Sequence, residues 1–236
     1  MCYNASVYFK PEQVQEQFKA QTLLQVLFPP AYLVSVHRSP HPALPMLTAD
    51  GPQLQPMYWG LTPSWNASFD PAWAKRMANA RVENLEQSKA WKGPFTYRRG
   101  VAVVDAFYEW RHQGKLKVPY RIQATQNRLL ALGAIWTYNG ALDLYSMSVV
   151  TVPANPMMAY IHNSKERMPL CFTKAEDWQT WIHGSPKEAI QIAKPLINGQ
   201  LEAYSIGKNI TRNDLAPNDP SLIEPVDYPG FPAHLD

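Results

Sequence analysis

The sequence of 236 residues has few cysteines, no long apolar run and little net charge. Its two cysteines stand at positions 2 and 171, so they cannot build a disulfide framework, and no secretory signal pattern opens the chain. The most apolar stretch, residues 23–28, is far shorter than the roughly 18 residues that a membrane-spanning helix needs. These absences predict a soluble protein of the reducing cytoplasm that does not enter a membrane.

Charge and histidine placement limit the classes of partner further. The 22 basic and 19 acidic residues leave a net charge of +3, which is too small to indicate a nucleic-acid partner, so any basic surface must be local. The six histidines are scattered, and His37 and His41 fall in a proline-rich stretch rather than on a helix. Because the cysteines are also far apart in sequence, we expect no metal site, and we expect no cofactor.

The distribution of residue types predicts a single domain over residues 1–236. Runs rich in β-branched and aromatic residues follow one another through the middle of the chain and predict a meander of antiparallel strands. These runs are residues 100–111, 118–124, 128–136 and 142–152. No repeat, low-complexity tract or linker interrupts them, and a proline-rich tail of about residues 217–236 should lie on the surface or loose.

Helices are predicted on both sides of these strands, from apolar residues near helical spacing and from capping signals. They are residues 11–28, a short helix opening at Asp70-Pro71, residues 83–91, residues 153–161, and two helices capped at Thr173 and Ser185. Between the first two, five prolines in residues 40–56 predict an extended loop, because proline lacks the N–H that regular structure uses.

Cys2 has the most distinctive chemistry in the sequence. Methionine is normally removed ahead of a small residue, which would leave Cys2 with a free α-amine beside its thiol. An α-amine has a pKa of about 7.7 to 8.0 and is partly unprotonated at neutral pH, so it can form a Schiff base with an aldehyde. The thiol could then close a thiazolidine ring, or it could act as a thiolate in acyl transfer. Equally, Cys2 could be a small buried apolar residue.

Five motifs spread from residue 2 to residue 169 are jointly distinctive. They are Met1-Cys2, Trp59-Gly60-Leu61-Thr62-Pro63-Ser64-Trp65, Asn79-Ala80-Arg81-Val82-Glu83, Asp105-Ala106-Phe107-Tyr108-Glu109-Trp110 and Ile161-His162-Asn163-Ser164-Lys165-Glu166-Arg167-Met168-Pro169. In this order they resemble the SOS response-associated peptidase (SRAP) family. The resemblance implies a mixed α+β fold, with helices around a curved or barrel-like, mostly antiparallel β-sheet.

The resemblance also implies a function in the DNA damage response. Its members sense abasic sites in single-stranded DNA, and their N-terminal cysteine links to the ring-opened sugar aldehyde, which is the chemistry that an aminothiol suits. We therefore expect single-stranded DNA with abasic sites as the partner of this chain. We expect it to act as a monomer that associates with the nucleoid when bound to DNA.

By resemblance, three residues assist Cys2. Asn79 would orient the nucleophile, Glu109 would transfer protons during sugar ring opening and imine formation, and His162 would shuttle a proton or hold a sugar hydroxyl. The aromatic neighbours of Glu109 in the sequence could desolvate it and raise its pKa. Each residue also has an ordinary explanation, as a turn residue, a surface carboxylate and a structural histidine respectively.

Four further residues are candidates for DNA contacts. Arg81 and Arg167 would bind phosphate, since a guanidinium group suits bidentate contact, although either could instead form a surface salt bridge. Trp59 and Trp65 could stack on bases or belong to the core. Trp65 precedes a polar stretch and should be the more exposed of the two.

The sequence departs from the family pattern near its start. Many members open Met-Cys-Gly-Arg-Phe, whereas Asn4 stands here in the place of the arginine. If that arginine binds a backbone phosphate, the contact is lost here or is supplied elsewhere, with Arg76, Lys75 and Arg98 as candidates. The spacing from His162 to Arg167 is also longer than usual, which changes the expected arginine–phosphate geometry.

Three functions are compatible with the sequence. The first is covalent capture of abasic single-stranded DNA by Schiff-base, lyase-like chemistry. The second is non-covalent binding of single-stranded DNA. The third is thiol peptidase activity through Cys2, including removal of Met1, as the older family name implies. That activity would need an oxyanion site, which no motif marks.

Overall fold

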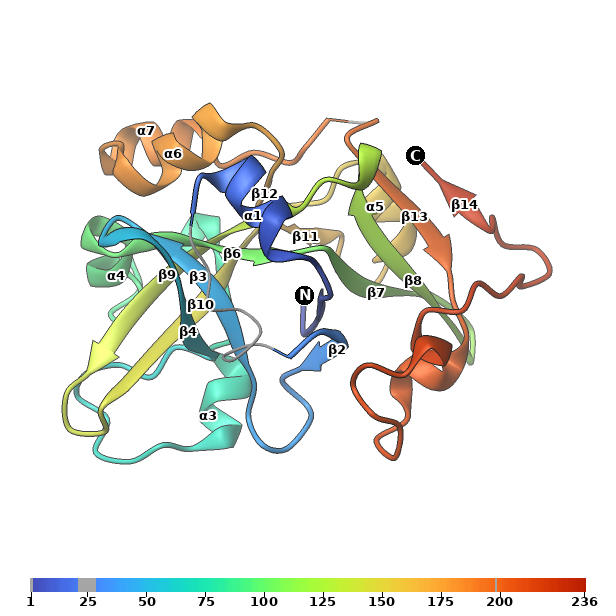
Figure 1. Ribbon diagram of the computed structural model, residues 1–236, viewed down its shortest axis with the longest axis horizontal. Helices are drawn as coiled ribbons and strands as arrows, with labels where there is room; N and C mark the ends of the chain where they lie inside the picture. The colour runs from blue at the N-terminus through green and yellow to red at the C-terminus, as the bar shows by residue number, and fades with distance from the viewer. Residues whose placement is uncertain (1, 21–28, 198) are drawn as a thin grey trace.

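The computed structural model describes residues 2–20, 29–197 and 199–236, which form two β-sheets with helices around them (Figure 1). The first sheet has six strands in the order β14-β13-β8-β7-β1-β2, and all of its pairs are antiparallel. These strands are β1 Asn4–Val7, β2 Ala31–Ser35, β7 Ala106–Gln113, β8 Leu116–Ala124, β13 Leu201–Ser205 and β14 His234–Leu235.

The second sheet curves into a ring. Strands β10, β4, β3, β6 and β9 pair in that order, and β9 pairs in turn with β10. They are β3 Ala43–Thr48, β4 Gly51–Trp59, β6 Arg99–Val104, β9 Leu130–Asn139 and β10 Leu144–Pro153, with the short strands β5 Asn79–Arg81, β11 Arg167–Pro169 and β12 Cys171–Phe172 at its borders. Among the described strands, only β4 and β5 pair parallel, both with β10. The predicted α+β fold with a barrel-like, mostly antiparallel sheet is confirmed.

Short helices surround the two sheets, and α6 and α7 lie side by side at one end of the ring (Figure 1). The α-helices of the described residues are α1 Pro11–Phe18, α3 Pro71–Arg76, α4 Lys92–Tyr97, α5 Pro156–Ile161, α6 Ala175–His183 and α7 Pro186–Ile192. The 3-10 helices are η1 Val82–Asn84, η2 Thr125–Asn127, η3 Lys208–Thr211 and η4 Pro220–Leu222. Within the described ranges, none of these helices has the length and apolar character to cross a membrane.

The extended loop predicted for residues 40–56 is wrong, because β3 and β4 form a hairpin there. Pro45 lies opposite Pro56 in this hairpin, so the missing N–H groups belong to one facing pair. β3 pairs with β6 only from Met46 onward, and β4 pairs with β10 only from Tyr58 onward, so neither proline has to donate to a further strand. Strands tolerate proline at such positions.

The strands in the middle of the chain do not form the predicted single meander, because they are shared between the two sheets. Residues 100–111 belong to two strands, β6 and β7, which lie in different sheets with Asp105 between them. β8 and β9 likewise follow each other in sequence and lie in different sheets. The alternation of residue types located these strands, but it carried no information about which strands pair.

The predicted helices differ from the structure in four places. The helix predicted for residues 153–161 begins only at Pro156, because Pro153 still belongs to β10. α1 ends at Phe18, and the predicted helical residues 21–28 lie outside the described residues. Residues 83–91 form turns, including η1, rather than a helix. Thr173 does not cap α6, whereas Ser185 caps α7 in the expected capping box.

The C-terminal segment lies on the first sheet. β14 pairs with β13, and the Tyr228 hydroxyl donates to the Ile206 carbonyl at 3.0 Å. The Tyr120 hydroxyl of β8 donates to the Pro232 carbonyl at 2.8 Å. These contacts place the proline-rich tail on the surface of the sheet, which is one of the two arrangements expected for it.

Asp105 links β1 to β8 through hydrogen bonds and an ion pair. Its Oδ2 accepts from Ser6 Oγ at 2.9 Å and from Arg121 Nη2 at 2.6 Å, and its Oδ1 accepts from the Tyr8 backbone N–H at 2.7 Å. Arg121 is buried and also donates to the Tyr108 hydroxyl at 2.9 Å. Loss of the Asp105 charge would leave the buried Arg121 guanidinium uncompensated, so the pair ties β1 to β8.

Gly60 turns the chain from β4 into the segment that carries Trp65. Its φ is 145°, and an added Cβ would collide with the Ala74 carbonyl of α3. We expect Gly60→Ala to lower the free energy of unfolding by at least about 2 kcal/mol, because the backbone of α3 or of the turn must move. Denaturant unfolding followed by circular dichroism measures this change.

Gly93→Ala in α4 is the matched control. No atom lies within 4 Å of the methyl group that it adds. Because alanine favours a helix, the control should leave stability unchanged or raise it by up to about 1 kcal/mol. Equal losses in the two variants would contradict the steric explanation.

Candidate functional site

Four predicted catalytic residues meet where the two sheets adjoin. Cys2 precedes β1, Asn79 lies on β5, Glu109 on β7 and His162 at the end of α5, and all four are buried. Asn79 Nδ2 donates to the Cys2 carbonyl at 2.8 Å, and His162 Nε2 lies 3.9 Å from Glu109 Oε2. Glu109 is also close enough to Cys2 for its charge to act on the thiol. The fold therefore gathers residues from four separate segments at one place.

Local structure at both ends of α5 positions His162. Asn155 is the N-cap, and its side chain accepts from the Met158 N–H at 2.8 Å, while Pro156 occupies the first turn, where proline is favoured. After His162 the chain turns sharply, because the N–H of Glu166 donates back to the His162 carbonyl at 2.9 Å. Arg167 is the first residue of β11, and its backbone carbonyl contacts the His162 imidazole.

The backbone of Arg167 fixes the tautomer of His162. The Nδ1 atom lies 2.8 Å from the Arg167 carbonyl, which can only accept, so Nδ1 carries the proton. Burial lowers the pKa of His162 to about 4, and the ring is therefore neutral at pH 7. Its Nε2 lone pair consequently faces Glu109.

Burial acts on Glu109 in the opposite direction. Desolvation raises the pKa of this carboxyl group from 4.5 to about 7, so both of its protonation states are populated at neutral pH. Such a group can give a proton in one step and take it back in the next. A carboxyl group of this kind beside a neutral imidazole is suited to proton transfer.

The Cys2 thiol is held in its protonated form. Burial, and after it the nearby Glu109, raises its pKa well above the ordinary value. A thiolate nucleophile needs the opposite, a thiol pKa lowered by positive charge or a helix N-terminus. The arrangement favours chemistry in which a neutral thiol adds to a carbon that is already activated.

Arg167 is not placed as the sequence predicted. Its guanidinium is buried and pairs with Glu83, with Nη1 at 2.5 Å from Oε1 and Nη2 at 3.0 Å from Oε2. Nη2 also donates to the Thr151 carbonyl at 2.6 Å. The predicted phosphate contact does not fit this arrangement, in which Arg167 holds β11 and the carbonyl that orients His162. The role of Glu83 left no signal in the sequence beyond its place at the end of the motif that begins at Asn79.

The two tryptophans differ as expected in exposure. Trp59 is fully buried, and its indole N–H donates to the Ala78 carbonyl at 3.0 Å, so the prediction that it stacks on DNA bases is wrong. Trp65 is 54% exposed, with Lys89 Nζ 5.3 Å from the centre of its ring. Arg81 is exposed at the end of β5, two residues after Asn79, and is accessible to a phosphate.

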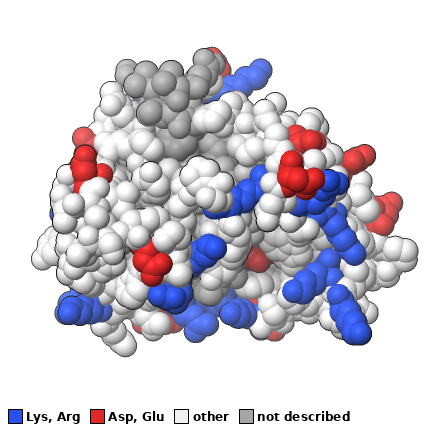
Figure 2. Space-filling view, turned by 90° about the horizontal axis from the view of Figure 1, so that it is seen from below, with Lys and Arg blue, Asp and Glu red and all other residues white. Residues whose placement is uncertain are grey.

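Basic side chains lie near the start of the chain despite the asparagine at position 4. Asn4 pairs with Ser35 in the first sheet, and the ring of the preceding residue, Tyr3, lies 5.2 Å from that of His37. Burial, together with the charge of Lys75 on α3, lowers the pKa of His37, so Lys75 is close to this segment. Figure 2 shows Lys and Arg side chains spaced around the hollowed centre of the face below.

Metal-ligating side chains do not gather in the described part of the chain. No group of three or more His, Cys, Asp or Glu residues there is arranged to hold a metal ion.

Comparisons with known proteins match nearly the whole chain. The model of the family described as SOS response associated peptidase (SRAP) matches residues 1–213. Abasic site processing protein YoqW of Bacillus subtilis is 28% identical over 233 residues, which are 95% of this chain and 99% of that protein. Abasic site processing protein HMCES of Gallus gallus is 28% identical over 209 residues, which are 77% of this chain and 60% of that protein.

A yeast relative and two solved structures extend the comparison. Abasic site processing protein YMR114C of Saccharomyces cerevisiae is 29% identical over 168 residues, 68% of this chain and 45% of that protein, so the match spans less than half of that relative. The crystal structure of a protein from Bacteroides thetaiotaomicron matches with a TM-score of 0.83 and 25% identity, over 94% of this chain and 98% of that one. One from Bordetella bronchiseptica has the same fold, with a TM-score of 0.74 and 17% identity, over 87% and 100%.

The raised pKa of Glu109 predicts a pH-dependent stability difference. Because the folded-state pKa of about 7 exceeds the ordinary 4.5, the unfolded chain releases this proton first as pH rises, and the parent protein loses stability across that interval. Glu109→Gln does not titrate. Its unfolding free energy relative to the parent should rise between pH 5 and pH 8 by on the order of 3 kcal/mol.

Denaturant unfolding at several pH values measures this difference. The matched control is Glu86→Gln, which alters an exposed carboxylate and should follow the parent at every pH. If the curves of Glu109→Gln and the parent ran parallel, the pKa of Glu109 would not be raised in the folded protein.

Proposed function

Because the chain belongs to the SOS response associated peptidase (SRAP) family, whose model matches residues 1–213, we propose that it processes abasic sites in DNA. Its relatives YoqW and HMCES are named abasic site processing proteins. The reaction that we propose is covalent capture of the abasic-site aldehyde, in single-stranded DNA, by Cys2 once Met1 has been removed. The observation that carries the proposal is the burial of Cys2 with Asn79, Glu109 and His162 in one site.

The first step opens the sugar. An abasic deoxyribose is mostly a cyclic hemiacetal, and its aldehyde forms when the C1′–O4′ bond breaks while a proton leaves the C1′ hydroxyl and another reaches O4′. The Nε2 lone pair of His162 can accept from a sugar hydroxyl, because its Nδ1 proton is held by the Arg167 carbonyl. Glu109, with a pKa of about 7, can donate the proton that O4′ needs. The proton that His162 accepted from the C1′ hydroxyl then passes from Nε2 to the Glu109 carboxylate, 3.9 Å away, so that both groups return to their starting states before the next step.

The second step forms the imine. The α-amine of Cys2 attacks the aldehyde carbon, and the resulting carbinolamine loses its hydroxyl group as water when Glu109 protonates it. Asn79 holds the Cys2 carbonyl and thereby limits rotation of the residue that carries both nucleophiles. The proton lost by the nitrogen returns to the Glu109 carboxylate, which restores the group.

The third step closes the thiazolidine ring. The Cys2 sulfur bonds to the imine carbon, the carbon–nitrogen double bond becomes single, and the thiol proton passes to the nitrogen. A neutral thiol suits this addition, and burial keeps the Cys2 thiol neutral. The same burial weighs against a thiolate peptidase mechanism, which would need a lowered thiol pKa.

The DNA contacts that we propose are peripheral to these steps. Arg81 follows Asn79 on β5 and is exposed, so it can bind a phosphate near the lesion. Lys75 lies near the segment of Tyr3 and His37, and it is the cation that we propose in place of the arginine missing at Asn4.

Substitutions of Cys2 separate the amine from the thiol. With a single-stranded oligonucleotide that carries one abasic site, the parent protein should form an adduct that survives denaturation, and the undamaged oligonucleotide should form none. Cys2→Ser keeps the amine but replaces the thiol, so its imine should be trapped only when borohydride is added. Denaturing gels and intact-protein mass spectrometry measure both products, and the same mass spectrum reports whether Met1 is present.

The matched control is Cys171→Ser, which alters the other buried cysteine. It should retain the adduct, since the proposed steps use only the amine and the thiol of Cys2. The proposal fails if the parent forms no adduct, or if Cys2→Ala forms as much of it as the parent.

The pH dependence of adduct formation should depend on Glu109. The amine is reactive only when unprotonated, so the rate rises toward pH 8, whereas loss of the Glu109 proton lowers it above about pH 7. We expect a bell-shaped profile for the parent. Glu109→Gln should be about 100-fold slower at pH 7, a typical general acid–base contribution, and its rate should rise to a plateau instead.

Quenched time courses between pH 5.5 and 9 give these profiles. Glu86→Gln is again the control and should reproduce the bell. If Glu109→Gln kept a bell-shaped profile, a group other than Glu109 would cause the fall in rate above about pH 7.

A further inference from the structure

A small polar pocket of about 260 Å³ lies at the first sheet, between the start of α1 and the connection from β8 to β9. Its lining comes from four separate parts of the chain. The lining residues are Tyr8, Gln13, Asp105, Arg121, Gln123, Ala124, Arg128 and Leu129. Most of them have polar side chains, so the pocket is suited to a polar ligand.

The pocket and the four buried residues at Cys2 lie on opposite faces of the first sheet. In the pairing of β7 with β8, Glu109 lies opposite Tyr120, and Tyr108 lies opposite Arg121. Successive side chains of a strand point to opposite faces of a sheet, so Arg121 points away from the face that carries Glu109. A ligand in the pocket therefore does not occupy the place of the captured sugar.

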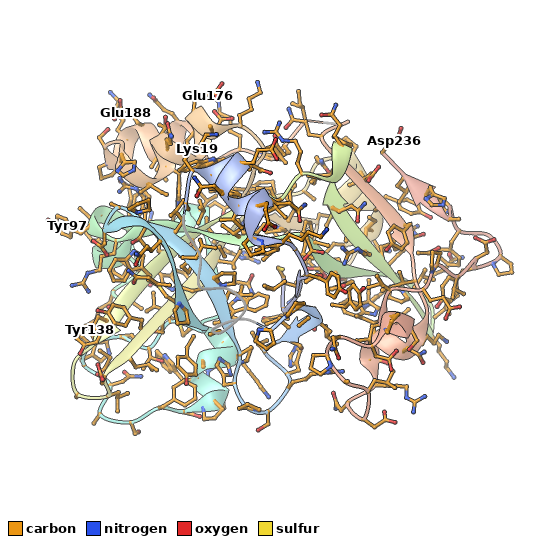
Figure 3. All side chains as sticks on the ribbon, viewed as in Figure 1. Lys19, Tyr97, Tyr138, Glu176, Glu188 and Asp236 are labelled. Atoms are coloured by element: carbon orange, nitrogen blue, oxygen red, sulfur yellow. The ribbon has the colours of Figure 1, made fainter. Side chains whose placement is uncertain are left out.

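Hydrogen bonds between its elements hold the walls of the pocket in place. α1 runs past the pocket toward Lys19, which is labelled in Figure 3. Gln17 of α1 donates through Nε2 to the Leu129 carbonyl at 2.6 Å, and its Oε1 accepts from the Leu129 N–H at 2.9 Å. On the other side, Gln123 Nε2 donates to Glu202 Oε1 at 2.8 Å. Walls that are fixed in advance reduce the ordering cost of binding a ligand.

A buried arginine forms the floor of the pocket. Arg121 is 7% exposed. Three of its five N–H groups donate within the described protein, to Asp105, Tyr108 and Gln123. The remaining two can donate to a ligand. The Asp105 carboxylate also lines the pocket, but it is paired with Arg121 and accepts two further hydrogen bonds from the segment that contains β1.

A second arginine lies at the rim of the pocket. Arg128 is exposed, and none of the ion pairs among the described side chains includes it. Gln13 adds an amide donor, because its Oε1 accepts from the Lys10 N–H at 2.9 Å and its Nε2 is left for a ligand. Since the charges of Arg121 and Asp105 compensate each other, Arg128 gives the pocket one net positive charge.

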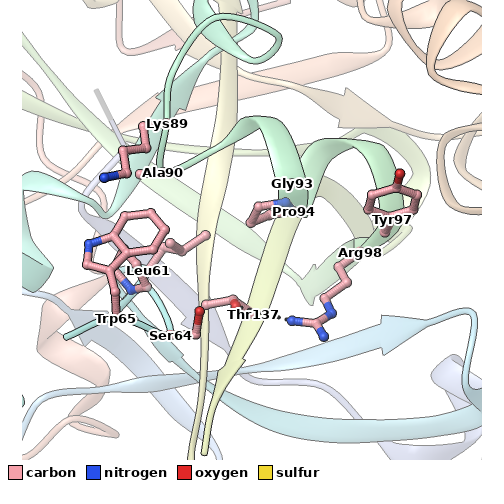
Figure 4. Close-up of a pocket in the computed structure, with 11 residues that line it drawn as sticks. Leu61, Ser64, Trp65, Lys89, Ala90, Gly93, Pro94, Tyr97, Arg98 and Thr137 are labelled. Atoms are coloured by element: carbon pink, nitrogen blue, oxygen red, sulfur yellow. Dashed lines mark hydrogen bonds between the residues drawn. The ribbon is translucent and has the colours of Figure 1, made fainter. Parts of the chain in front are cut away.

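The larger pocket of about 360 Å³ beside α4 lacks a buried cation. The cations that line it, Lys89 and Arg98, are both exposed (Figure 4). Water screens such charges, whereas a hydrogen bond from a buried guanidinium acts in a region of lower dielectric constant and is stronger. The pocket at Arg121 is therefore the better site for a small anion.

We propose that the pocket at Arg121 binds a small oxyanion, a carboxylate or a phosphate group, whose oxygens accept from Arg121 and Arg128 together. A guanidinium group suits such a ligand, because its parallel N–H groups match two oxygens. The pocket is smaller than those that hold drug-sized ligands, so its occupant is an inorganic ion or a small metabolite. This occupant contacts the ion pair that ties β1 to β8, and its binding does not depend on a DNA lesion.

Titrations of the full chain followed by heteronuclear NMR test this proposal. The probes are inorganic phosphate and succinate, and succinamide is the uncharged analogue of succinate. At millimolar concentrations, at least one of the two anions should shift the backbone signals of Tyr8, Gln123 and Arg128 in a saturable manner, whereas succinamide should not. The anion that binds more tightly identifies the chemical class of the ligand. If neither anion shifts these signals, the proposal is refuted.

Substitution of Arg128 tests the contact at the rim. Arg128→Gln should raise the dissociation constant of the anion at least about 10-fold, as expected for loss of one charge-assisted hydrogen bond. Arg128→Lys keeps the charge but loses the planar pair of donors, so its dissociation constant should lie between those of Arg128→Gln and the parent.

Lys117→Gln is the matched control, because Lys117 is an exposed lysine of β8 that does not line the pocket. It removes one positive charge from the same strand as Arg121 and should bind the anion like the parent. If it weakened binding as much as Arg128→Gln, net charge alone would explain the effect and the site would be refuted.

DNA binding by the same variant separates this inference from the proposed function. Arg128→Gln should form the adduct with abasic DNA at the parent's rate and with the parent's salt dependence, since Arg128 lies across the sheet from Cys2. A shallower salt dependence would make a DNA phosphate the occupant and overturn the proposal. If the parent forms no adduct, the proposed function fails, and the anion titrations still decide whether the pocket binds an oxyanion.

Discussion

The position of the candidate site depends on one carboxylate. Asp105 stands where the chain passes from the ring of strands into the first sheet, and it accepts hydrogen bonds from Ser6, Tyr8 and Arg121. β1 is only four residues long, too short for its own ladder bonds to fix it tightly. The ion pair with the buried Arg121 supplies the missing constraint and sets the place from which Cys2 enters the site.

Burial then gives each group in the site its chemical state. The same loss of solvation raises the pKa of Glu109 and lowers that of His162, because it disfavours charge on both. It also keeps the Cys2 thiol protonated. A site assembled in this way holds neutral groups that exchange protons over short distances. At the border of the site, Glu83 pairs with the guanidinium of Arg167.

Local motifs were sufficient to find Cys2, Asn79, Glu109 and His162, because each stands in a short distinctive sequence. The contacts that decide the roles of other residues join distant segments and left no local pattern. Arg167 pairs with a glutamate 84 residues away, which turned a predicted phosphate ligand into a support of His162. The β3–β4 hairpin could not be predicted from its prolines, because their tolerance depends on where the neighbouring strands begin to pair.

The hydrogen bond from Asn79 to the Cys2 carbonyl spans 77 residues, and Glu109 and His162 lie further along the chain. A ribosome that adds about 5 to 20 residues per second therefore exposes Cys2 many seconds before its partners exist. During that interval Cys2 lacks the buried surroundings that raise the pKa of its thiol. The order of synthesis thus leaves Cys2 open to solvent in the nascent chain until the later strands cover it.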